Sequence, residues 1–122
     1  MYREITIGKE SIPMKATGAT PIRYRMVFKG DLLNEFSKVN DNYQVAIDTI
    51  SQLAFIMAMT AKSKDGKQDL SKLNLNLYME WLEQFDPMDL PMASEQIVNL
   101  YLGNTVTSSE PKKKEKENQS EK

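Results

Sequence analysis

The chain has 122 residues, of which 40% are hydrophobic and 27% are charged, and its formal net charge is -1. This length and composition are typical of one globular domain, and the balanced charge gives no general attraction to nucleic acid or acidic membranes. The chain contains no cysteine and no histidine. Their absence removes thiolate nucleophiles, the commonest general base and the commonest metal ligands, so we expect no catalytic residue, no cofactor and no metal site.

The N-terminal residues predict a β-hairpin. Residues 2–7 alternate in character and residues 11–16 continue in an extended style, with a short glycine-containing turn at 8–10 between them. Pro13 indicates that the second strand is an edge strand. An isolated hairpin is only marginally stable in water, so we expect it to lie against helices or another strand.

Two short helices should follow the hairpin. Thr20 suits the N-cap of the first helix and Pro21 suits its first position. Gly30 can close this helix in the left-handed conformation, and Asp31 can cap the next one.

The strongest helical pattern covers residues 43–61, where apolar residues recur at helical spacing. In its second half the polar face disappears, because residues 53–59 are all apolar. A helix that is apolar on every side is buried, either inside its own domain or by a partner.

A polar loop is expected over residues 62–69, followed by a helix over 73–85 that Asp86 and Pro87 stop. The predicted fold class is therefore mainly α (α+β): an N-terminal β-hairpin followed by a compact bundle of about four to five helices.

The last predicted helix covers residues 94–102, with Ser94 as its N-cap and Gly103 at its end. Beyond it, residues 104–122 are rich in Lys, Glu, Ser and Gln and almost without apolar side chains. Such a segment cannot offset its ordering entropy by burial. We therefore expect one domain over residues 1–103 and a disordered charged tail over 104–122.

Two charged groups allow a binding interpretation. An acidic set, which a weak divalent cation site would require, comprises Glu80, Glu83, Asp86 and Asp89. A basic run, which a nucleic-acid patch would require, covers residues 112–114. We favour a solvated acidic face for the first group. For the second we favour a solvated linker, because glutamates accompany the lysines and no aromatic residue interleaves with them.

Eight methionines are many for a chain of this length. Met57, Met59 and Met79 lie in the two strongest helical patterns, and Met88 and Met92 flank a proline-rich turn. Methionine suits both irregular cores and adaptable binding surfaces. Core packing is the favoured interpretation. The all-apolar stretch at residues 53–59 adds some support to the alternative, that the methionines form a binding surface.

The N-terminal motif resembles a known family. Residues 12–25 (IPMKATGATPIRYR), followed by residues 28–33 (FKGDLL), resemble the opening of tail assembly chaperones from siphophages and prophages of Gram-positive bacteria. The resemblance covers roughly residues 5–36 and includes no catalytic residue.

The resemblance implies a function in the cytoplasm of a bacterial host. Such chaperones bind the tape measure protein until tail tube subunits polymerise around it, and they are absent from the finished particle. Many also exist as a longer, frameshifted product that recruits the tail tube protein, and the lysine run at residues 112–114 would fit a slippery codon run. We expect neither nucleic acid nor membrane as a partner, and self-association into a homo-oligomer is left open.

The predicted contact residues are Phe55, Ile56 and Met59, which project away from the main apolar stripe of the 43–61 helix. The alternative is that these three side chains pack beneath the hairpin or beneath the 73–85 helix. Three other functions are weighed against the chaperone: a structural neck or tail-completion protein of the virion, a nucleic-acid-binding regulator, and an enzyme, which the missing histidine and cysteine disfavour.

Overall fold

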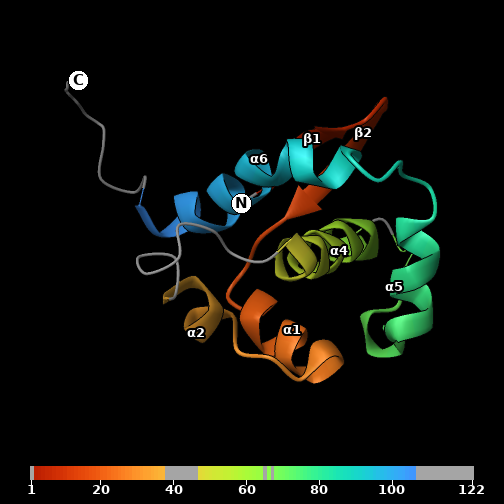
Figure 1. Cartoon of the computed structure of the whole chain (residues 1–122). Helices are drawn as coiled ribbons and strands as arrows, with labels where there is room; N and C mark the ends of the chain where they lie inside the picture. The colour runs from red at the N-terminus through yellow and green to blue at the C-terminus, as the bar shows by residue number, and fades with distance from the viewer. Residues whose placement is uncertain (1, 38–46, 65, 67, 107–122) are drawn as a thin grey trace, which may run out of the picture.

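The computed structural model describes residues 2–37, 47–64, 66 and 68–106. This part of the chain forms one hairpin, five α-helices and a single 3-10 turn (Figure 1), so the predicted class, mainly α with an N-terminal hairpin, is confirmed. The elements in chain order are β1 (Tyr2–Ile7), β2 (Glu10–Lys15), α1 (Thr20–Phe28), α2 (Leu32–Ser37), α4 (Ile47–Lys64), η1 (Leu70–Lys72), α5 (Leu75–Leu82) and α6 (Asp89–Val106).

The hairpin forms as predicted, and one face of it is buried. Its strands are antiparallel, and Ile5 and Met14 are fully buried. A sheet of two strands has only edge strands, which accommodates Pro13. The turn requires glycine, because Gly8 has a φ of +64° and a Cβ there would lie 2.5 Å from Oδ2 of Asp89. The tip of the hairpin therefore packs closely on the start of α6.

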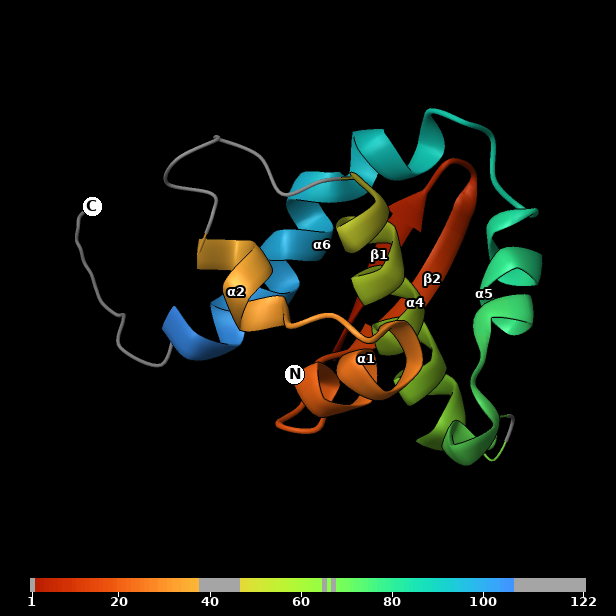
Figure 2. The same ribbon diagram turned by 60° about the horizontal axis from the view of Figure 1, so that its bottom comes forward.

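Helix α4 is the centre of the molecule. Figures 1 and 2 show the hairpin and α6 on one side of it, α1 on another and α5 along its flank. Nearly every residue of α4 between Thr49 and Ala61 is buried. Leu53 and Met57 are completely inaccessible. The all-apolar sequence of this helix is thus explained by neighbours on all sides.

Aromatic side chains join α1, α4 and α5 into one cluster. Its rings belong to Tyr24, Phe28, Phe55, Tyr78, Trp81 and Phe85, with neighbouring centroids 5.0 to 6.2 Å apart. Tilted and edge-to-face pairs at such distances add to the stabilisation from burial. The hydroxyl of Tyr24 also donates a hydrogen bond of 2.6 Å to Oε1 of Gln52, which ties α1 to α4.

The ends of α1 differ by one residue from the prediction. Ala19 occupies the N-cap, and Oγ1 of Thr20 accepts a 2.9 Å hydrogen bond from the backbone N–H of Thr17. The threonine hydroxyl therefore closes the preceding turn and does not cap the helix. At the other end Lys29, with φ 66°, takes the left-handed conformation predicted for Gly30.

The cap of α2 is confirmed, because Oδ1 of Asp31 accepts a hydrogen bond of 3.3 Å from the backbone N–H of Asn34. Helix α4 continues to Lys64, three residues into the predicted loop. Its predicted first turn, at residues 43–46, and the predicted disorder of residues 107–122 fall outside the described residues.

Both predicted ends of the last helix were wrong. Helix α6 begins at Asp89, five residues before Ser94, and runs through Gly103 to Val106. Pro91 is tolerated because it lies in the first turn, where a backbone N–H has no partner within the helix. The hydroxyl of Ser94 donates to the carbonyl of Pro91 inside the helix.

Candidate partner-binding surface

The predicted contact residues lie in the core. Phe55 and Ile56 are 0% exposed and Met59 is 3% exposed. The ring of Phe55 packs edge-on against Tyr78 and Trp81 of α5, at centroid distances of 5.4 and 5.7 Å. The expectation that these three residues form an accessible contact face is therefore wrong for the folded chain. The alternative arrangement, with these side chains packed inside the domain, is the one observed.

The described methionines divide into two groups. Met14, Met57 and Met59 are buried and fill the core. Four others are more than half exposed: Met26, Met79, Met88 and Met92. The core interpretation therefore applies to the first group. In the exposed group, Met79 lies on α5, Met88 directly precedes α6, Met92 lies near the start of α6 and Met26 lies on α1.

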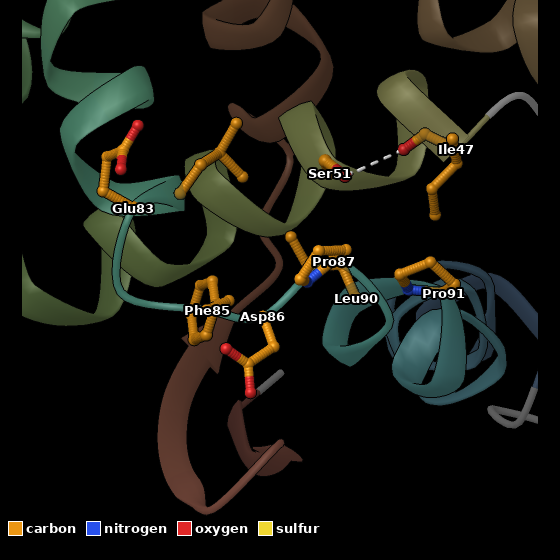
Figure 3. Close-up of a pocket in the computed structure, with 9 residues that line it drawn as sticks. Ile47, Ser51, Glu83, Phe85, Asp86, Pro87, Leu90 and Pro91 are labelled. Atoms are coloured by element: carbon orange, nitrogen blue, oxygen red, sulfur yellow. Dashed lines mark hydrogen bonds between the residues drawn. The ribbon is translucent and has the colours of Figure 1, made fainter.

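An apolar groove lies where α5 ends and α6 begins, against the start of α4 (Figure 3). Its volume is about 340 Å³. We call it the α5–α6 groove. Its lining residues are Ile47 and Ser51 from α4, Leu82 from α5, Glu83, Phe85, Asp86 and Pro87 from the connection, and Leu90 and Pro91 from α6.

The walls of the α5–α6 groove are fixed by the core behind them. Phe85 packs edge-on against Trp81, with ring centroids 5.0 Å apart. Leu90 is buried in the core cluster, whereas Ile47 remains 45% exposed at the mouth. The hydroxyl of Ser51 donates to the carbonyl of Ile47, so it adds no unsatisfied polar group. The groove is therefore largely apolar and pre-formed.

The four acidic residues considered as a cation site are not gathered into one metal-binding group. Oδ2 of Asp89 accepts a hydrogen bond of 2.9 Å from the backbone N–H of Asp86, at the start of α6. Asp89 therefore supports the turn, whereas the side chains of Glu83 and Asp86 are exposed at the groove. Among the described residues, no group of three or more acidic side chains is placed to hold a metal ion.

Two other concavities are less suited to apolar contact. One lies between α1 and α5, and Lys29, Asn74 and Asn76 contribute to its lining. The other lies between α4 and α5, with the buried Phe55 and Met59 beneath a rim that is mostly polar. Two of the predicted contact residues thus reach the floor of a hollow without offering an exposed face.

Sequence reasoning missed the residues of the α5–α6 groove. Pro87 and Pro91, spaced one turn apart beside Met88 and Met92, were the available signal. Proline is favoured at the start of a helix, and methionine suits adaptable surfaces. The pairing of that turn with Ile47 depends on the tertiary fold and has no local signature.

No family model, curated protein or solved structure matches this chain. Within the described ranges, no helix combines the length and apolar character needed to cross a membrane. The lysine run at 112–114, on which a nucleic-acid interpretation would depend, lies outside the described residues.

Proposed function

We propose that this protein is a tail assembly chaperone of a siphophage or prophage, which binds the tape measure protein in the host cytoplasm without chemistry. The observation that carries the proposal is the α5–α6 groove, a pre-formed apolar concavity beside the exposed Met88 and Met92. The N-terminal motif supplies the family resemblance and hence the identity of the partner.

The groove suits the apolar stripe of an amphipathic helix. Its volume of about 340 Å³ is at the small end of protein pockets, so it accepts one or two anchoring side chains. Exposed methionines adapt to neighbouring side chains of varied shape. A single contact of this size is weak, which allows tail tube subunits to displace the chaperone. Several copies along one long helix would gain from avidity.

The residues of the family-like motif belong to the scaffold of the fold and do not line the α5–α6 groove. They build β2, the following turn, α1 and the start of α2. Thr20 and Tyr24 are buried, and a Cβ on Gly30 would lie only 3.2 Å from Cε1 of Tyr24. These packing requirements give a physical reason for the motif residues in this chain.

Co-expression with the tape measure protein of the same phage tests the proposal. We expect the tape measure protein to become soluble and to elute with this chain in gel filtration. A tape measure protein that remains insoluble in the presence of this chain, with no complex in the soluble fraction, would reject the chaperone function.

The alternative, a structural neck or tail-completion protein, is separated by the composition of purified virions. The chaperone proposal expects this chain to be absent from them by mass spectrometry, and a stoichiometric amount in the particle would favour the structural role. The proposal includes a longer frameshifted product that recruits the tail tube protein, for which the codons of residues 112–114 are the test.

A further inference from the structure

The chain segment that forms most of the α5–α6 groove carries charges of one sign. Residues 73–103, which include α5, the connection and most of α6, contain no lysine or arginine but five carboxylates: Glu80, Glu83, Asp86, Asp89 and Glu95. Two of them, Glu83 and Asp86, line the groove and are exposed. A partner that enters the groove therefore meets apolar walls with negative charge beside them.

Part of this charge already has a structural role. Asp89 accepts the N–H of Asp86 and lies in the first turn of α6, where a carboxylate is favoured by the helix dipole. Asp48 is placed in the same way in the first turn of α4. These two residues need no partner to explain their presence.

Glu83 lacks such an explanation. It occupies the C-cap of α5, and Glu80 precedes it by one turn, while the last turn of this helix contains no basic residue. The C-terminus of a helix carries partial negative charge, so carboxylates there repel it. No cationic side chain among the described residues pairs with Glu83 or Asp86. A partner that brings positive charge to this site would relieve the repulsion.

From the groove and this uncompensated charge we infer that the α5–α6 groove selects a basic amphipathic helix. An apolar side chain of that helix enters between Phe85, Leu90 and Ile47, and lysine or arginine residues beside its apolar stripe pair with Glu83 and Asp86. The inference rests on the proposed function for the identity of the partner, which would be a lysine- or arginine-bearing segment of the tape measure protein.

The same charges disfavour other occupants. An acidic helix would place like charges opposite Glu83 and Asp86, which opposes binding. Anionic lipid surfaces and nucleic acid are repelled for the same reason. Charge thus supplies selectivity, and the apolar groove supplies the anchor.

Two synthetic helical peptides test the inference by fluorescence anisotropy with the full chain. Both carry one leucine stripe at i, i+3, i+4 and i+7, and they differ only in having lysine or glutamate beside it. We expect the lysine peptide to bind about tenfold more tightly at low salt, as two exposed ion pairs would give. The preference should shrink at about 300 mM salt, where the Debye length is short.

Matched charge changes locate the effect. Glu83→Lys should weaken binding of the lysine peptide about tenfold, whereas Glu4→Lys, the same change at an exposed position of β1, should leave it within about twofold. Circular dichroism of each variant shows that it is folded. The milder Glu83→Gln should give an intermediate loss.

Several outcomes would overturn the inference: equal binding of the two peptides, binding of neither, equal effects of the two charge changes, or preferred binding to anionic vesicles or duplex DNA. Failure of the inference and failure of the chaperone function are distinguishable. If the tape measure protein is held without any charge preference, only the inference fails. If the lysine peptide is selected but the tape measure protein is not held, only the chaperone function fails.

Discussion

Methionine has two environments in this chain that one sequence pattern does not distinguish. Met57 is enclosed by the core of α4, whereas Met92 is 77% exposed on α6. The flexible thioether fills irregular space in the first case and presents a deformable apolar surface in the second. The environment, and not the residue type, therefore decides what each methionine contributes.

Met57→Ala should lower the free energy of unfolding by about 2–5 kcal/mol, because a fully buried side chain leaves a cavity. Leu53→Ala should behave in the same way. Met92→Ala is the matched control and should change stability by less than about 0.5 kcal/mol. Urea denaturation measures all three, and a loss below about 1 kcal/mol at both buried sites would contradict their central position.

The buried phenol of Tyr78 should make the stability of the folded chain fall at alkaline pH. Burial, assisted by the negative charge of Asp48, raises the pKa of Tyr78 from 10.0 to about 12. The folded chain thus holds the phenol proton more tightly than the unfolded chain does. This contribution is fully present below pH 10 and is lost as pH rises toward 12.

Tyr78→Phe should therefore lose less stability than the parent between pH 9 and pH 11.5, measured as urea midpoints. Burial also raises the pKa values of Tyr24 and Tyr101, so the variant retains part of the decline. Identical slopes for the two proteins would contradict a buried Tyr78 phenol.

At the scale of elements, the sequence predicted turns and caps correctly where neighbouring residues determine them. It failed where tertiary packing determines where a helix begins and ends. The hairpin followed from alternation and Gly8, and the cap of α2 followed from Asp31. The start of α6 was missed because Pro91 looks like a breaker yet fits a first turn. Gly103 was expected to end α6, but the helix continues through it. A helical glycine carries only a modest penalty, which tertiary contacts can override.

The C-terminus of α5 predicts a small gain in stability on loss of charge. Glu83→Gln should stabilise the chain by about 0.3–1 kcal/mol at low ionic strength, because it removes a carboxylate from the negative end of a helix. Glu95→Gln, within the interior of α6, should have a smaller effect. Thermal midpoints at low and high salt measure both, and a destabilised Glu83→Gln would show that the carboxylate has a favourable partner in the free chain.

At the scale of the whole molecule, topology explains why the candidate site was not predictable. The sequence of α4 has more apolar side chains than one buried face requires. Three of them, Phe55, Ile56 and Met59, were predicted to contact a partner. These additional apolar side chains pack instead against the hairpin, α1, α5 and α6. How many neighbours surround a helix is a non-local property, so the α5–α6 groove can be recognised only when α4, α5 and α6 are placed together.

The core also predicts where the chain can be shortened. Its buried apolar residues extend from Ile5 to Leu100, with Tyr101 packed against them. Removal of residues 107–122 should therefore leave the thermal midpoint within a few degrees of the parent. A larger drop would show that this segment contributes to the folded domain.

Binding of the tape measure protein in the α5–α6 groove is tested by comparing Ile47→Glu with Leu33→Glu in co-purification. Ile47 is 45% exposed at the mouth of the α5–α6 groove, and Leu33 is 78% exposed on α2, away from the lining residues. Both variants should remain folded, because neither side chain is buried. We expect Ile47→Glu to lose the complex and Leu33→Glu to retain it. Retention of the complex by a folded Ile47→Glu variant would contradict binding of the tape measure protein in the α5–α6 groove.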